Sequence, residues 1–123
     1  MKPNDEASTL EAEIANLIQS QPSKDRLLEI LGEEDGALFA SPTDKIKRGL
    51  RFLRNAIDRV RDQMCGNDFI RAQGESVSMQ RKALAVAASL DFLGTKGAAT
   101  AAVLIIQIGL ENVCANRWEQ HVK

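Results

Sequence analysis

The segment from Ala98 to Leu110 most constrains the fold, because almost every side of it is apolar when it is wound as a helix. At a helical turn of about 100° per residue, its large aliphatic side chains are distributed around the whole helix axis. Only Thr100, Gln107 and Glu111 share a narrow polar line. A helix of this kind must be surrounded by the rest of the chain, so we expect it to be the central helix of the core.

The composition is that of an ordinary globular domain. The 123 residues are enough to bury one sizeable core without metals or disulfides, so we expect one domain over residues 1–123. Apolar residues make up 44% and charged residues 27%, which argues against wholesale disorder and against a fibrous class. With no Tyr, one Trp and four Phe, the core should be aliphatic, and few aromatic rings remain for stacking nucleobases.

A second apolar run precedes the central segment. It begins with a helix capped by Ser76 or Ser78, and its apolar side chains recur at helical spacing to Leu93. Gly94 to Gly97 then forms a short break, which predicts an antiparallel helical hairpin at the C-terminal end of the chain. Each apolar run is shorter than the ~20 residues of a membrane span, so we expect no membrane insertion.

Two shorter helices are expected in the N-terminal third. After a disordered tail over residues 1–7, Ser8 and Glu11 form a capping-box pattern that opens a helix ending near Ser20. Ser23 is positioned to cap a second helix, which runs to Leu31. Gly32 suits the left-handed position that often follows a helix end.

The strongest local signal is Ser41-Pro42-Thr43-Asp44. Ser41 is a good N-cap, Pro42 fits the first helical position, and Asp44 favours the positive end of the helix dipole. A narrow apolar stripe then continues to Cys65, predicting a helix about 36 Å long at 1.5 Å per residue. The stripe consists of Ile46, Leu50, Leu53, Ile57, Val60 and Met64. Gly66-Asn67 stops the helix, and Asn67 to Glu75 is predicted to be a polar loop.

The complete prediction is an all-α, single-domain bundle of about five helices.

Charge is divided unevenly along the chain. Residues 1–44 hold ten acidic and three basic side chains, for a net charge of −7, whereas residues 45–82 hold four acidic and ten basic ones, for +6. The two parts attract each other. Within one molecule this attraction pairs complementary faces, and between molecules it favours head-to-tail association.

The polar side of the long helix is the candidate binding face. Lys47, Arg54 and Arg61 recur at i, i+7 and i+14, so they line one flank where they are spaced to follow phosphates. Arg51 lies with other arginines toward the opposite flank. The same helix carries Gly49, which permits close approach of another helix. It also carries Phe52, whose ring stays partly exposed unless another segment packs on it. Near the C-terminus, Trp118 is interpreted as a lid over the core, with a partner anchor as the alternative.

Catalytic and metal chemistry have weak support. Cys65 and Cys114 lie far apart without a C-x-x-C pattern, and we interpret them as two small core residues in a reducing, cytoplasmic protein. Arg117-x-x-x-His121 resembles the Arg-and-His signature of the helical HEPN ribonucleases over this pentapeptide. That signature has a longer spacer and usually a polar residue after the Arg, where this chain has Trp118. The resemblance implies an RNase-like enzyme. We predict no catalytic residue, metal or cofactor.

The sequence therefore favours a non-enzymatic protein–protein interaction module that associates with itself. The basis is that the predicted hairpin offers more apolar surface than two short helices and one narrow stripe are expected to cover. Binding of nucleic acid through the basic face is the alternative, and an RNase-like helical enzyme is the remote one.

Overall fold

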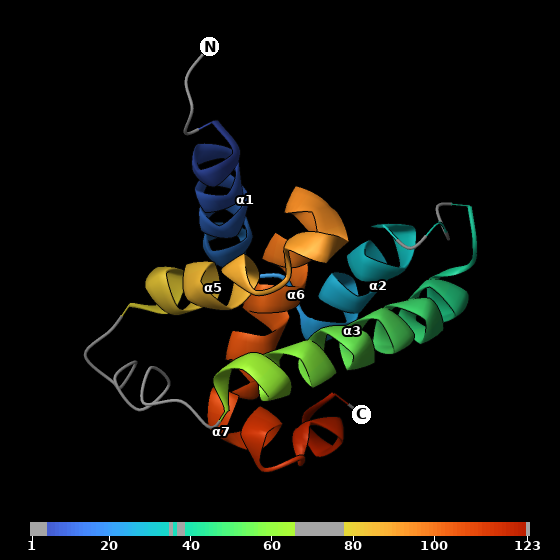
Figure 1. The fold of residues 1–123 in the computed structure, drawn as a ribbon. Helices are drawn as coiled ribbons and strands as arrows, with labels where there is room; N and C mark the ends of the chain where they lie inside the picture. Colours follow the sequence, from blue (N-terminus) through green and yellow to red (C-terminus); the bar gives the residue numbers. More distant parts are fainter. Residues whose placement is uncertain (1–4, 35, 37–38, 66–77, 123) are drawn as a thin grey trace.

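The described residues fold into helices packed around one central helix (Figure 1). The computed structural model describes residues 5–34, 36, 39–65 and 78–122. The predicted loop at 67–75 lies outside these residues, as do the first four residues of the predicted tail. The described helices are α1 (Asp5–Ser20), α2 (Lys24–Glu34), α3 (Pro42–Met64), α5 (Met79–Ala88), α6 (Gly94–Ile108) and α7 (Leu110–Cys114), with two 3-10 helices, η1 (Asp91–Leu93) and η2 (Trp118–His121). Within the described ranges there is no strand, which confirms the all-α prediction.

Helix α6 is the centre of the core, as its sequence predicts. All of its residues from Gly97 to Ile105 are buried, and α1, α2 and α5 pack against it. The buried Thr100 satisfies its hydroxyl by donating to the Lys96 carbonyl oxygen at 2.7 Å. Helices of the same chain therefore surround this part of α6.

The break between the two apolar helices lies earlier than predicted. α5 ends at Ala88, and the chain passes through η1 before α6 begins at Gly94. The Ser89 hydroxyl donates to the Val86 carbonyl oxygen at 2.7 Å and satisfies an acceptor at the end of α5. Gly94 has a positive φ of 76°, which glycine adopts without a side-chain penalty, so the helix starts at Gly94 rather than after Gly97. The antiparallel hairpin geometry stays a prediction.

Helices α2 and α3 approach each other through two glycines. Gly49 of α3 faces the backbone of Leu28, and Gly32 of α2 faces the backbone of Lys45. A Cβ at either glycine would overlap the facing carbonyl oxygen. The prediction that Gly49 admits a neighbouring helix is confirmed. The prediction that Gly32 follows the end of α2 is wrong, because Gly32 lies buried inside the helix, where its missing side chain makes room for α3.

The N-terminus of α3 is capped as predicted. The Ser41 hydroxyl accepts a hydrogen bond from the Asp44 backbone N–H at 3.2 Å, and Pro42 occupies the first helical position. Of the apolar stripe, Leu53, Ile57 and Val60 are fully buried.

We expect Ser41→Ala to lower the free energy of unfolding by about 1 kcal/mol, because the substitution leaves one N–H of the first turn without its acceptor. Urea denaturation monitored by circular dichroism measures the change. Thr43→Ala is the matched control, since Thr43 is exposed in the same turn and is not the N-cap. Equal effects of the two substitutions would contradict the capping role.

The start of α1 differs from its prediction. α1 begins at Asp5, within the predicted tail, so Ser8 lies inside the helix and is not its N-cap. Its end at Ser20 is confirmed: Gln21 has a φ of 49° and Pro22 follows, a combination that cannot continue a helix. The buried Ile14 fixes the inner face of α1 against the core.

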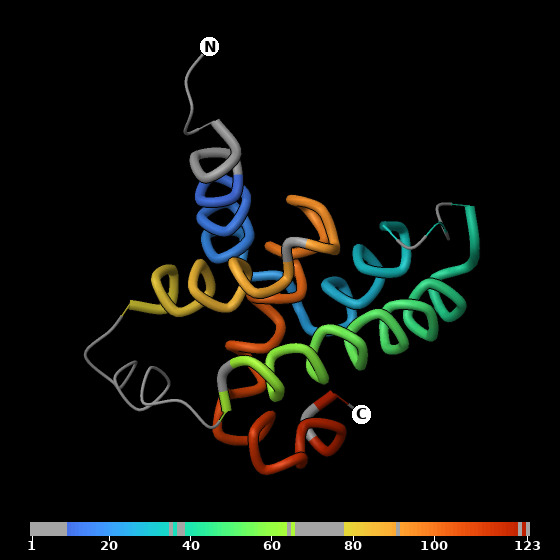
Figure 2. The backbone as a smooth tube through the Cα atoms, in the orientation of Figure 1, coloured from blue at the N-terminus to red at the C-terminus, as the bar shows by residue number. Residues whose placement is uncertain are grey.

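The chain bends twice after α6. Gly109 has a φ of 102° and separates α6 from α7, and Asn116 has a φ of 60° and separates α7 from η2. These two bends turn the chain back along the end of α3 (Figure 2). None of the helices in the described ranges has the length and apolar character to traverse a bilayer.

The two cysteines form a disulfide between the end of α3 and the end of α7. Cys65 and Cys114 are joined with their Cα atoms 5.4 Å apart, and both are half-buried. The interpretation of the cysteines as two separate core residues is therefore wrong. The bend at Gly109, which precedes α7 and separates it from α6, is not encoded in the spacing of the two cysteines.

Candidate binding surface

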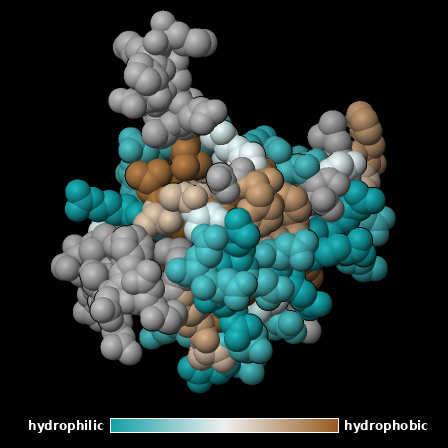
Figure 3. All heavy atoms as spheres, viewed as in Figure 1, coloured by the Kyte–Doolittle hydropathy of each residue, from teal (hydrophilic) through white to brown (hydrophobic). Residues whose placement is uncertain are grey.

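Hydrophilic side chains gather over α3 on the face shown in Figure 3. Lys47, Arg48 and Arg51 are exposed on the N-terminal half of this helix, and we call these three residues the basic surface. Among the residues that the structure describes, Lys47 and Arg51 have no ion-pair partner. Two cations of the basic surface are therefore open to an external anionic group.

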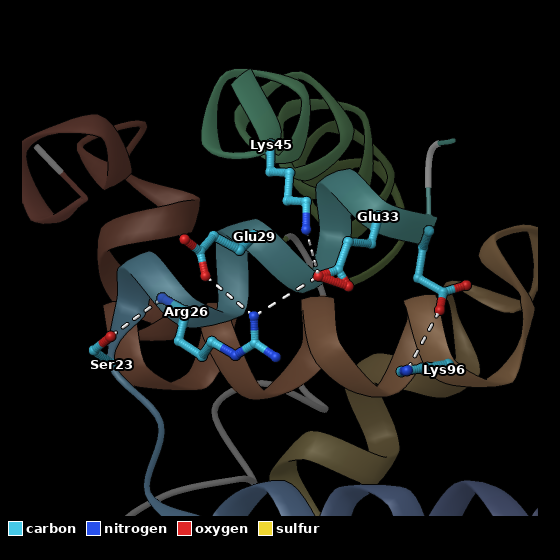
Figure 4. A network of polar contacts seen from close by, with 7 residues as sticks. Ser23, Arg26, Glu29, Glu33, Lys45 and Lys96 are labelled. Carbon is cyan, nitrogen blue, oxygen red and sulfur yellow. Dashed lines mark hydrogen bonds and ion pairs between the residues drawn. The ribbon is translucent and has the colours of Figure 1, made fainter. Parts of the chain in front are cut away.

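Part of the charge on α3 is neutralised by α2 (Figure 4). The Glu33 carboxylate accepts a hydrogen bond from Lys45 Nζ at 3.2 Å and lies 3.7 Å from Arg26 Nη1. The Lys45 and Glu33 side chains are only 19% and 21% exposed, so this pair is less screened than an open surface pair. Arg26 also pairs with Glu29 at 3.1 Å. The acidic and basic parts of the sequence thus meet within one molecule, at the start of α3.

The C-terminal segment occupies the flank of α3 that carries Arg54 and Arg61. Arg54 Nη2 lies 3.2 Å from Glu119 Oε1, and its guanidinium carbon lies 6.0 Å from the centre of the Trp118 ring. Arg61 Nη1 donates to Asn116 Oδ1 at 3.3 Å. Of the three aligned cations in the predicted phosphate-binding flank, two already have partners inside the chain.

The predicted apolar interface residues all have contacts within the fold. Gly49 is covered by the backbone of α2, and the half-buried Phe52 ring lies against Gly97, where an added Cβ would be 3.5 Å from it. Trp118 is 4% exposed and belongs to the core, which agrees with its interpretation as a lid. Their use in an interface stays a prediction.

Two exposed aromatic side chains in the described ranges are not among the binding residues that the sequence predicts. Phe39 is 97% exposed and lies beside Lys47 in a shallow hollow of about 450 Å³ at the start of α3. Phe92 is 53% exposed, with the Arg59 guanidinium carbon 5.4 Å from the centre of its ring. The sequence signal for Phe39 is its position two residues before the Ser41 cap, outside any periodic apolar stripe.

Helix α1 carries the opposite charge. Its sequence contains four acidic residues and no basic residue. Glu11 is exposed and Glu13 half-exposed, and in the described part of the chain neither forms an ion pair. Because they are two positions apart in a helix, they point about 200° apart around its axis, so we call them the acidic flanks of α1. The main neighbours of α1 are α5 and α6, and α1 extends away from α3 (Figure 1).

The site has no recognisable catalytic geometry in its described part. Arg117 is exposed, whereas the side chain of His121 lies outside the described residues, so the RNase-like pairing stays a prediction. No group of three His, Cys, Asp or Glu residues within the described ranges is arranged to hold a metal ion. No protein-family model, curated protein or solved structure matches this chain.

Proposed function

We propose that this protein is a non-enzymatic helical interaction module that binds a second copy of itself. An acidic flank of α1 in one copy docks on the basic surface of α3 in the next. The observation that carries the proposal is the separation of charge. Glu11 and Glu13 lie on a helix that packs on α5 and α6, while Lys47 and Arg51 of α3 form no ion pair with any described residue. Each copy therefore presents a surface complementary to another copy.

The apolar contribution to this contact comes from the segment just before α3 and not from α6. Gly97 to Ile105 of α6 are buried by the chain's own helices, so this part of α6 offers no open apolar face for association. Phe39 is almost fully exposed beside Lys47, and an aromatic side chain next to cations is typical of an interface anchor. We therefore include Phe39 in the proposed interface.

The proposed contact is head-to-tail, because the two surfaces lie on different helices. Such contacts form rings when the rotation between copies closes, and open chains when it does not. Exposed ion pairs contribute only about 0.2–1 kcal/mol each, so the association should be weak and should weaken further with salt.

Charge reversal in each surface tests the proposal. We expect Lys47→Glu/Arg51→Glu and, separately, Glu11→Lys/Glu13→Lys to weaken self-association by about tenfold or more. A mixture of the two variants should regain association, because each unmodified surface meets its complement and the two reversed surfaces also complement each other. Sedimentation velocity over a concentration series at low salt measures all three samples.

Arg117→Glu is the matched control, because Arg117 is an exposed cation outside both surfaces. Its association should equal that of the unmodified chain. A monomer at low salt, or growing oligomers of either variant alone, would contradict the proposal. Filter binding of the same samples to nucleic acid tests the alternative: salt-sensitive binding lost in Lys47→Glu/Arg51→Glu would assign the basic surface to phosphates instead.

The disulfide indicates in which kind of cellular compartment the protein is found. Stable disulfides are typical of oxidising compartments, so the Cys65–Cys114 pair favours such a compartment over the cytoplasm predicted from the sequence. The proposed association depends on surface charge and is independent of location.

A further inference from the structure

The chain beyond Cys114 covers the end of α3. We call residues 115–122 the C-terminal lid. The Trp118 side chain of the lid is buried, and Val122 packs against the core. Two bends at Gly109 and Asn116, both with positive φ, separate this part of the chain from α6. The lid is thus a short terminal element attached to the core through turns.

Besides the disulfide at its base, the lid contacts α3 through exposed polar groups. The Arg54–Glu119 pair has side chains 63% and 48% exposed, and exposed pairs of this kind are weak. The Arg61–Asn116 hydrogen bond is also exposed. Burial of Trp118 is the main non-covalent contribution, and it acts against the conformational entropy of a free chain end. The Cys65–Cys114 bond fixes the base of the lid to α3.

The disulfide is accessible to a small reductant. Both cysteines are half-buried and line a shallow hollow of about 480 Å³ together with Asp58, Arg61 and Asp62. Arg61 offsets one of the two carboxylates, so the charge beside the bond is small and the thiolate of a dithiol without further charges can approach it. Access of the attacking thiolate is one of the factors that govern the rate of thiol–disulfide exchange.

We propose that the Cys65–Cys114 disulfide is a redox latch that keeps the C-terminal lid closed over α3. A thiolate of a dithiol attacks one sulfur, the S–S bond breaks, and a mixed disulfide forms. The second thiol of the reductant then displaces the protein sulfur and closes its own disulfide. The protein gains two thiols and the dithiol is oxidised, so electrons and protons balance. The lid then opens, exposing Trp118 and releasing Arg54 and Arg61 from their partners.

The single Trp of the chain reports the lid directly. Purified oxidised protein is treated with dithiothreitol, an uncharged dithiol, and Trp118 emission, acrylamide quenching and helix content by circular dichroism are recorded together. We expect a red shift and stronger quenching after reduction, with unchanged helix content. The Cys65→Ser/Cys114→Ser variant should show the open-lid emission from the start and should not respond to the dithiol.

Two outcomes would overturn the latch. Unchanged Trp118 emission after complete reduction, verified by thiol titration, means that the lid stays closed without the bond. A red shift accompanied by loss of helix content means that the disulfide supports the whole fold and not the lid. This readout is independent of self-association. The further consequence that released Arg54 and Arg61 enlarge the basic surface rests on the proposed function, and sedimentation of the reduced protein tests it separately.

Discussion

Gly49→Ala is expected to lower the free energy of unfolding by about 2–3 kcal/mol, although alanine is the better helix former by about 1 kcal/mol. The reason is that the new Cβ would overlap the Leu28 backbone carbonyl oxygen. A backbone group cannot rotate away as a flexible side chain does, so α2 and α3 must move apart. Urea denaturation of the variant measures the loss as a lower midpoint.

Asn55→Ala is the control for this prediction. Asn55 lies in the same helix on the exposed side, so alanine there changes helix propensity without meeting α2. We expect a small stabilisation, opposite in sign to the effect at Gly49. A Gly49→Ala variant at least as stable as the unmodified chain would refute the close approach of the two helices.

Leu104→Ala is expected to destabilise the protein by about 3 kcal/mol, within the range of roughly 2–5 kcal/mol seen for such truncations in cores. Leu104 is fully buried in α6, which is enclosed by α1, α2 and α5. A cavity at this position has packed helices around it, so the surrounding structure can collapse only partly. Thermal and urea unfolding measure the change.

Ile106→Ala provides the comparison within the same helix. Ile106 is only half-buried, so its truncation removes less packing and should have a clearly smaller effect than Leu104→Ala. Equal losses at the two positions would mean that α6 is not enclosed as described.

The elements that the sequence predicts correctly depend on neighbouring residues. The Ser41 cap acts on an N–H three residues away, and the apolar stripe of α3 depends on spacing within one helix. The central position of α6 follows from its composition, since a helix that is apolar on all sides has to be buried. For these features the local pattern and the tertiary structure agree.

The features that the sequence does not predict depend on residues far apart in the chain. Gly32 is equally suited to a helix end and to a helix crossing, and only the position of Lys45 decides between them. The pairing of Cys65 with Cys114 depends on the bend at Gly109. That bend and the one at Asn116 precede Glu119, which pairs with Arg54, so the sequence overestimates the number of unpaired cations on α3.

The packing of α1 against α6 has a consequence for biosynthesis. Seventy-three residues separate Ser20 from Gly94, so the first helix leaves the ribosome well before its main partner is made. At ordinary rates of translation this delay is on the order of ten seconds including α6 itself. During that interval the apolar side of α1, including Ile14, remains uncovered, which makes the nascent chain a natural client for a chaperone near the exit tunnel.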